Sequence, residues 1–479
     1  MNSSLLTPTE GLLLLSAYLV VLVVIVFFAH KGEKSSDEFL VYRRQLGTFR
    51  GALSIAAAWI WAPAVFVCSL KSYTQGMAGI FWFTVPNVLC FFTFTPLAIR
   101  LRKICPNGYT WPDFVWQRYD GDRRVHIASL IVYLGYDLIG ITANCLAGGT
   151  LLNILTGADF HYSVILMSFG ALTYSLISGF RASVLTDVIQ MIVILVIGAI
   201  IVPWVISVVG GTPVIMSGLG GVSGKYSSPF NFEVFYSFGI AATIGLISGP
   251  IGDQMFFQRA FSAKPEKVGT IFILGGLIFA LVPITLSLLG FIAASPEIHS
   301  QLNITDPQMV GPTVVEHFLP KWALMLFCIM AFAGLCSTLD SALCAISSLW
   351  TVDIYKRYIN KNPTDAELTK SARRSMIFAS IIGTLIALMR PEILWLFLIG
   401  GALASAALFP TIFGILSSKL TATAAFWAIA LGLLLGAPLS IYANLVNDTD
   451  LIVLAAVLSV GVGLIICSYS VLTNQAAKV

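Results

Sequence analysis

The strongest constraint on this chain is a series of apolar segments, each about twenty residues long. A helix of that length crosses a hydrocarbon core of roughly 30 Å, whereas the strands of a membrane barrel alternate between apolar and polar residues. The chain is therefore predicted to be an all-α polytopic membrane protein with about 13 transmembrane helices. The predicted spans are 11–29, 51–70, 79–98, 126–146, 163–179, 183–207, 235–257, 268–294, 323–350, 375–389, 393–416, 422–441 and 451–472.

The composition supports this class. Of the 479 residues, 57% are hydrophobic and only 10% are charged, and the mean hydropathy is +0.89, which is far from the values of a soluble domain. The net charge of +4 gives no reason to expect a nucleic-acid partner. The eight cysteines are scattered without a CxxC pair, so neither a disulfide framework nor a metal site is indicated.

The basic residues predict the orientation. If the N-terminus lies outside, all but four of the 27 Lys and Arg residues fall on the inner side. Cytoplasmic loops carry such an excess of positive charge. We therefore expect a plasma (cytoplasmic) membrane protein with its C-terminus in the cytoplasm. The four exceptions are Lys71, Lys225, Lys321 and Arg390.

Two predicted spans carry helix-breaking residues in their interiors. Span 51–70 contains Pro63, and span 235–257 contains Gly249, Pro250 and Gly252. These interruptions lie five spans apart, and a unit of five spans leaves the membrane on the side opposite to its entry. Two inverted repeats, 51–207 and 208–418, are thus expected, preceded by an extra helix and loop in 1–50 and followed by two helices in 419–479. Paired interruptions of this kind point to a transporter's central site, although ordinary proline kinks are also common in membrane helices.

Another polar feature lies in the ninth span, where hydroxyls gather beside a carboxylate. Ser337, Thr338, Asp340 and Ser341 follow each other within an apolar segment. A carboxylate at membrane depth needs a partner, a wet cavity or an ion, and a stripe of oxygen atoms suits a cation. The alternative is that these hydroxyls bond to the preceding turn of their own helix.

Three stretches in order, 177–191, 249–267 and 337–356, resemble motifs of the sodium:solute symporter family. The resemblance covers essentially the whole chain. It implies a LeuT-type fold of two inverted five-helix repeats, with alternating access coupled to sodium. Sodium would be the coupling ion, no other cofactor is implied, and the protein would not be an enzyme.

The resemblance also implies a sodium site made of oxygen ligands. Backbone carbonyls of the first core helix map onto Ala56 and Trp59. The eighth core helix adds the carbonyl of Gly334 and the hydroxyls of Ser337 and Thr338. Because these two helices belong to opposite repeats, a bound ion would hold the repeats together.

Some family members have a second sodium site, which maps onto Asp187, Ser337, Asp340 and Ser341. Asp340 departs from the pattern, because such members carry a hydroxyl there. It could strengthen cation binding or allow proton coupling. Asp187 could instead bond to Arg181 or to helix ends.

The segment 56–83 looks most like the urea transporter branch of the family, and the implied solute-facing positions form an aromatic group with few polar side chains. Such a cage suits a small, flat or uncharged polar solute, with a lean toward urea. Asp253 could instead cap a helix, and the Trp residues could simply pack. Asp137 and Asn144 add a polar stripe without an assigned role. The implied positions are Trp61, Pro63, Trp82, Phe83, Pro86, Asp253 and Gln254.

Other functions remain open at this level. A proton-coupled symporter, or one for an amino acid, organic acid or sugar, would have the same fold. A passive channel would conduct without accumulating its solute. A membrane enzyme should cluster His, Glu or Cys within its spans, whereas the His residues here lie at span ends or in loops. The partners expected are therefore a small-molecule solute, sodium and the lipid bilayer, and the sequence leaves the oligomeric state open. The five histidines are His30, His126, His161, His299 and His317.

Overall fold

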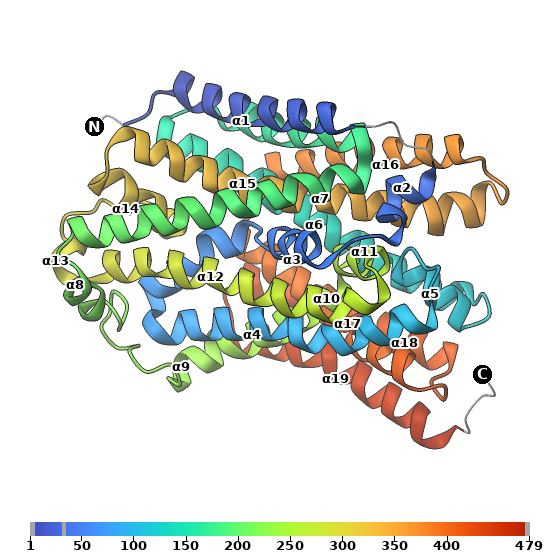
Figure 1. The fold of residues 1–479 in the computed structure, drawn as a ribbon. Coiled ribbons are helices and arrows are strands. Elements are labelled where there is room, and N and C mark those ends of the chain that lie inside the picture. The colour runs from blue at the N-terminus through green and yellow to red at the C-terminus, as the bar shows by residue number, and fades with distance from the viewer. Residues whose placement is uncertain (1–4, 31–34, 475–479) are drawn as a thin grey trace.

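The computed structural model describes residues 5–30 and 35–474, which form one elongated bundle of helices (Figure 1). Within these residues the only pairing of the β type is an isolated bridge between Leu46 and Ala263. The helices are α1 (Pro8–Ala29), α2 (Ser36–Val41), η1 (Tyr42–Arg44), α3 (Thr48–Ala58), η2 (Pro63–Val67), α4 (Cys68–Ile104), α5 (Trp111–Arg118), α6 (Arg123–Thr156), α7 (Phe160–Val208), α8 (Thr212–Ser217), α9 (Phe232–Val234), η3 (Phe235–Gly239), α10 (Ile240–Gly252), α11 (Gln254–Ser262), η4 (Pro265–Lys267), α12 (Val268–Ala294), α13 (Pro296–His299), η5 (Pro307–Met309), α14 (Val310–Phe318), α15 (Lys321–Ser348), η6 (Leu349–Ile359), α16 (Asp365–Leu388), α17 (Ile393–Leu416), α18 (Ala422–Leu445) and α19 (Thr449–Thr473).

Helix α7 contains two crossings, because the chain reverses at Gly179. This residue has a φ of 53° and a ψ of −136°, which no helix contains. On either side of it, the Tyr174 hydroxyl and the Ser183 hydroxyl both donate to Asp340 of α15, at 2.8 and 2.6 Å. The two halves of α7 therefore run side by side against α15.

The first crossing after α1 consists of α3, η2 and the start of α4. Ile55 of α3 lies against Gly275 of α12, and the Ser69 hydroxyl donates to the carbonyl of Leu286, further along α12, at 2.8 Å. This crossing therefore runs parallel to α12.

The rest of α4 returns along α12 in the opposite direction. The turn is at Gly76, whose φ is 55°. After it, Phe91 packs on Phe279 and Phe94 on Phe272, so the contacts move back toward the start of α12.

These reversals settle the number of crossings. Eleven helices in the described part of the chain are long and apolar enough to cross a membrane. Two of them, the stretch 63–104 and α7, contain a reversal, and each reversal adds one crossing. The thirteen crossings that result confirm the predicted all-α polytopic architecture.

Both predicted interruptions are present. The first occupies 59–61, between α3 and η2, and Pro63 opens the helix that follows. The second is at Asp253, whose extended backbone (φ −113°, ψ 117°) separates α10 from α11. Pro250 remains inside α10, three residues before the break. Both breaks therefore lie in the middle of the bundle, where backbone groups are left without helical partners.

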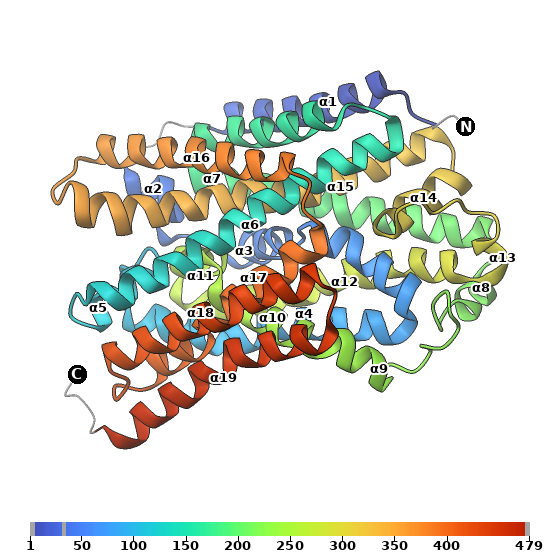
Figure 2. The ribbon, with the colours of Figure 1, turned by 180° about the vertical axis from the view of Figure 1, so that it is seen from behind.

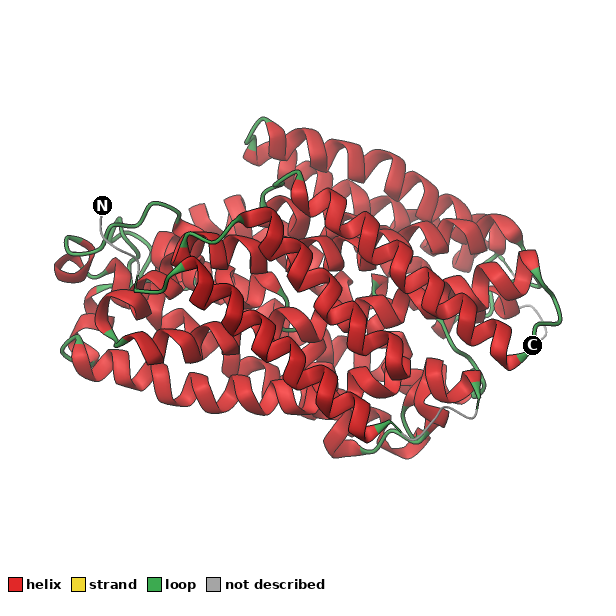
Figure 3. Cartoon of the chain, turned by 90° about the horizontal axis from the view of Figure 1, so that it is seen from above, coloured by secondary structure: helices red, strands yellow, loops and turns green. Residues whose placement is uncertain are grey.

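The connections gather at the two ends of the bundle (Figure 3). One end carries α2 and α5, and is called the α5 end below, while α8, α9, α13 and α14 lie at the other (Figures 1 and 2). The start of α1 and the end of α19 lie at opposite ends (Figure 2), as an odd number of crossings requires.

Candidate functional site

The hydroxyl pair of α15 lies against the carbonyl end of α3. Ser337 Oγ donates to the carbonyl of Ala57 at 2.8 Å, and Thr338 Oγ1 donates to that of Ala58 at 3.0 Å. Ser337 also lies 2.9 Å from the carbonyl of Gly334 in its own helix. Two hydroxyls and three carbonyls, all from buried backbone or side chains, therefore meet where the first core helix breaks.

These partners differ by one position from the carbonyls that the resemblance implied. The carbonyl of Ala56 accepts the N–H of Trp59 at 3.3 Å, so the hydroxyls reach the two carbonyls between the implied pair. Gly334 allows the close approach, since a Cβ added there would lie 3.2 Å from the carbonyl oxygen of Ile60. All potential ligand atoms of this group are oxygens, and some of them lie on an unwound segment. Such a set suits a hard cation such as sodium.

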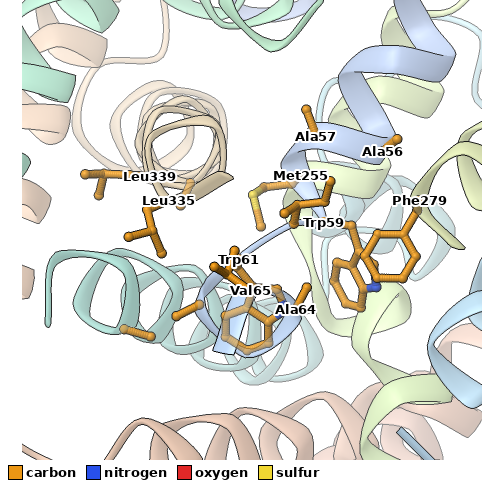
Figure 4. Packing of buried hydrophobic residues seen from close by; sticks show 14 of the residues in the cluster. Ala56, Ala57, Trp59, Trp61, Ala64, Val65, Met255, Phe279, Leu335 and Leu339 are labelled. Carbon is orange, nitrogen blue, oxygen red and sulfur yellow. The ribbon is translucent and has the colours of Figure 1, made fainter. Parts of the chain in front are cut away.

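Apolar side chains enclose this contact. In Figure 4, Leu335 and Leu339 of α15 and Met255 lie around the irregular segment that carries Trp59 and Trp61. All five side chains are buried. Because the surrounding side chains are buried, polar groups at the break that lack a partner are costly.

Asn144, which had no assigned role, supports the first break. Its side-chain oxygen accepts the N–H of Ala62 at 3.0 Å, and its amide nitrogen donates to the carbonyl of Gly140 at 2.7 Å. The N–H of Ala62 lies just after the break and just before Pro63, where it has no helical partner. A polar side chain facing a broken span is the signal that could have identified this role.

Replacing Asn144 with leucine is expected to lower the free energy of unfolding by about 1–3 kcal/mol, because the buried N–H of Ala62 loses its acceptor. Thermal unfolding of the purified protein in detergent would measure this loss. The matched control is Asn444→Leu, since the Asn444 amide donates to a carbonyl of its own helix, that of Ser440. Equal effects of the two substitutions would remove the assignment.

A buried arginine organises the second predicted ion group. Arg259 Nη2 donates to Asp187 Oδ2 at 2.7 Å and to Ser341 Oγ at 2.8 Å, and its Nε donates to Ser54 Oγ at 2.9 Å. Ser54 Oγ in turn donates to Asp187 Oδ2 at 2.6 Å. These four side chains are fully buried. The chain itself thus supplies a cation beside Asp187 and Ser341.

Asp340 lies in the adjoining part of this network. Ser183, Tyr174 and Thr186 donate hydroxyl groups to its carboxyl oxygens at 2.6, 2.8 and 3.1 Å. Ser341 adds a longer contact of 3.4 Å. The network therefore holds two buried carboxyls and one guanidinium, which is bonded to Asp187, so its charge balance allows one proton or one further cation.

The alternative pairing of Asp187 with Arg181, suggested from the sequence, is wrong. Arg181 pairs instead with Glu38, at 2.6 Å, near the α5 end. Arg259 belongs to the stretch 249–267, yet the sequence interpretation gave it no role. An arginine inside an apolar segment is costly, and that cost is the signal that could have identified it.

The aromatic positions fall into separate groups. Trp61 lies 6.4 Å from Tyr136 and 5.9 Å from Phe397, measured between ring centroids, and Phe83 lies 6.4 Å from Phe397. Pro63 is buried at the start of the adjoining helix. These rings, from three different crossings and the broken segment, form an apolar wall near the centre of the bundle.

The other tryptophans have packing roles. Trp59 Nε1 donates to Asn87 Oδ1 at 2.6 Å, and its ring packs on Phe256 with centroids 4.9 Å apart. Trp82 packs on Phe235 of η3, while Pro86 is buried one turn further along α4. Trp82 therefore lies against the start of the second broken span.

Asp253 and Gln254 have different environments at the second break. Asp253 Oδ1 accepts the N–H of Met255 at 2.6 Å, so it caps α11, as the alternative interpretation expected. The Gln254 side chain makes two hydrogen bonds to the backbone at the start of α5. Its Oε1 accepts the N–H of Trp111 and its Nε2 donates to the carbonyl of Tyr109, each at 3.1 Å. Gln254 thus fastens the break to the α5 end.

A cluster of charged residues closes that end. Asp353 accepts the hydroxyl of Thr110 at 2.5 Å and lies 3.1 Å from Nε2 of His126, while Arg357 pairs with Asp113. Burial raises the pKa of Asp113, and the nearby Asp353 carboxylate raises it further. The cluster joins α5, α6 and the end of the α15 crossing.

The fold and the two broken spans define a membrane transport protein. The family model of the sodium:solute symporter family matches residues 39–432. The chain belongs to this family, whose members are transporters and not enzymes.

Relatives and solved structures agree with this assignment. The chain is 25% identical over 437 residues to the "Urea-proton symporter DUR3" of Oryza sativa subsp. japonica, which covers 84% of this chain and 60% of that protein. It is 25% identical over 367 residues to the "Urea active transporter" of Saccharomyces cerevisiae, covering 72% of this chain and 50% of that protein. The chain thus matches little more than half of the length of these relatives. A structure of a Na+-coupled sialic acid symporter superposes with a TM-score of 0.77 at 18% identity, over 98% of both chains, which shows the LeuT-type fold.

Proposed function

We propose that this protein is a sodium-coupled secondary active symporter that imports a small polar solute, with urea as the leading candidate. The observation that carries this proposal is the contact of Ser337 and Thr338 with the carbonyl end of α3. A sodium ion accepted there would tie α15 to the broken first core helix. The residues that would hold it are Ala56, Ala57, Ala58, Trp59, Gly334, Ser337 and Thr338.

The repeats would then move as units around this contact. The boundaries we propose are 51–207 and 208–418 for the repeats, with 1–50 and 419–479 as flanking segments. The N-terminus would lie outside and the C-terminus in the cytoplasm of a plasma membrane, so that the α5 end faces the cytoplasm. In that orientation the cluster around Asp353 would close the inner side of the bundle.

The driving force of one ion is sufficient for accumulation. One charge crossing a potential of 100 mV supplies roughly 2.3 kcal/mol, and a tenfold sodium gradient adds about 1.4 kcal/mol. The sum of roughly 3.7 kcal/mol allows several-hundredfold accumulation of a neutral solute per ion.

Urea is supported by the two relatives, which are named for it. The wall of Trp61, Phe83, Tyr136 and Phe397 also suits a small flat molecule, because it offers few groups that could bond a sugar. Because the matched region covers only 60% and 50% of these relatives, urea is a proposed solute of this chain and not an assigned one.

The second candidate is coupling to protons. The rice relative is named a urea-proton symporter. In this chain the network of Asp187, Asp340 and Arg259 has one carboxyl more than its buried cation balances. Asp340, with Ser341, is then the proposed proton or second cation position, and accumulation driven by an acid exterior without sodium would favour it.

Substitution of Ser337 or Thr338 by alanine tests the sodium site. Each is expected to weaken the apparent affinity for sodium about tenfold, while the affinity for the solute at saturating sodium changes little, because one oxygen ligand is lost. Uptake by proteoliposomes at varied sodium concentration measures both quantities. The matched control is Ser347→Ala, whose hydroxyl bonds only to Cys344 of its own helix among the described residues. Unchanged sodium dependence in both test variants would remove the assignment.

A further inference from the structure

Two carboxyl groups at the centre of the bundle carry oxygens that no donor reaches in the described part of the chain. Asp137 of α6 and Asp253 of the second break are both fully buried. Neither oxygen of Asp137 has a hydrogen-bond partner, and neither does Oδ2 of Asp253. The two carboxyls lie against each other, within reach of a shared hydrogen bond. This arrangement is called the carboxyl pair below.

The neighbours of the carboxyl pair do not compensate its charge. The titratable groups that face it are Tyr133 and Tyr136 on α6, Cys90 on α4 and Arg259 on α11. The Tyr133 hydroxyl donates to a backbone carbonyl of α10, and the Arg259 guanidinium is bonded within the Asp187 network and to the carbonyl of Met255. No cation among the described residues is therefore left for the pair.

A comparison within the same molecule shows how unusual this is. Asp340, equally buried, accepts hydroxyl groups on both of its oxygens. Asp187 accepts from an arginine and a serine on Oδ2, although its Oδ1 has no partner among the described residues. Buried polar groups are almost always satisfied in this way. Both oxygens of Asp137 accept nothing, so a purely structural role does not explain this carboxyl. A ligand that brings hydrogen-bond donors does.

We propose that Asp137 and Asp253 share one proton and that the protonated pair binds a neutral solute carrying N–H groups and a carbonyl, of the urea type. This inference rests on the proposed function and assigns the solute contact to a residue without a previous role, Asp137. Two carboxylates in contact cannot both stay ionised in a dry site. With one proton held between the two carboxyls, their remaining oxygens accept hydrogen bonds from the amino groups of the solute.

The location fits this chemistry. Asp137 follows Tyr136, whose ring is 6.4 Å from Trp61, so the carboxyl pair and the aromatic wall adjoin each other. Gly249 of α10 has space for little more than a hydrogen, because a Cβ there would lie 3.0 Å from the Tyr136 hydroxyl and 2.7 Å from Trp59. The second broken span is therefore closely packed against the aromatic wall at this point.

The charge of the solute fixes the direction of the pH dependence. A neutral solute needs the shared proton, so its affinity should fall about tenfold per pH unit once the pair loses that proton. A cationic analogue with similar N–H groups, such as guanidinium, would replace the proton and bind more tightly as the pH rises. The two classes therefore have opposite pH profiles.

The experiment uses the full chain in proteoliposomes and measures uptake of urea and of guanidinium under a fixed inward sodium gradient, from acid to alkaline pH. The wild type is expected to take up urea with an affinity that falls toward alkaline pH. Asp137→Asn, which keeps the shape but cannot ionise, should retain uptake and lose this pH dependence. Asp137→Leu should lose at least about tenfold in affinity, since it has no polar group left. Sodium-dependent thermal stabilisation of each variant checks that it is folded.

The outcomes separate the two proposals. Urea uptake with the same pH profile in the wild type and in Asp137→Asn would overturn this inference and leave the symporter intact. A preference for guanidinium that strengthens with pH would overturn it as well. If neither solute accumulates under the sodium gradient at any pH, the urea assignment and this inference fail together, while sodium-dependent stabilisation of the protein would still support the sodium site.

Discussion

Replacing Arg259 with methionine is expected to lower the free energy of unfolding by about 3–5 kcal/mol, because the Asp187 carboxylate would be left buried without its cation. A loss of that size is a large part of the total stability of a typical domain. The expected result is a strong decrease in folded, monodisperse protein after extraction. Thermal unfolding followed by size-exclusion chromatography measures it directly.

A double substitution provides the control for this prediction. In Arg259→Met combined with Asp187→Asn, both charges are absent, and most of the stability should return. Arg259→Lys should be intermediate, since an ammonium cannot contact Asp187, Ser341 and Ser54 with the geometry of a guanidinium. If Arg259→Met alone is as stable as the wild type, the ion pair has no structural importance.

Substitution of Gly179 by alanine is the second large effect that we expect. The φ of 53° disfavours any residue with a side chain, and the added Cβ would lie 2.7 Å from the carbonyl oxygen of Phe39. Strain and clash together should cost at least about 2 kcal/mol. Because the chain reverses here between two crossings, the yield of inserted protein should fall, which quantitative fluorescence of a tagged chain in membranes would measure.

Two other glycines make this prediction specific. Gly224 has a φ of 72° but open space around its Cβ position, so Gly224→Ala should cost only about 1 kcal/mol. Gly461 has neither a positive φ nor a neighbour within 4 Å, and lies inside α19. Gly461→Ala should therefore be neutral or slightly stabilising. A cost at Gly179 no larger than that at Gly224 would show that the contact with Phe39 is unimportant.

Much of the fold was predictable because its signals are local. Length and hydropathy predicted the thirteen crossings, and Pro63 predicted the first break within a few residues. The second break was less exact. Pro250 and Gly252 suggested an interruption, yet both stay inside α10 and the helix ends at Asp253. A membrane helix tolerates a proline where neighbouring groups satisfy the freed carbonyl, so the residue alone does not locate the break.

The site was predictable only in part, because its contacts join distant segments. Ser337 and Thr338 stood out by their density of hydroxyls, but their carbonyl partners, Ala57 and Ala58, have no side-chain signal. Arg259 and Asp187 are 72 positions apart in the chain, and the only arginine that the sequence suggested as an alternative partner was Arg181, which is nearer in sequence. Charge alone cannot decide between two arginines. The packing of α11 against α15 places Arg259, and not Arg181, beside Asp187.

The adjacency of Asp253 and Gln254 has a mechanical consequence. Asp253 belongs to the carboxyl pair, while Gln254 holds the backbone of Tyr109 and Trp111 through two hydrogen bonds. Consecutive Cα atoms across a trans peptide are fixed about 3.8 Å apart. The backbone positions of Asp253 and Gln254 are therefore coupled. A displacement of the backbone at either residue also moves the backbone of the other. Under the proposed function, a solute that moves Asp253 would therefore also stretch the hydrogen bonds of Gln254 to the segment at the start of α5.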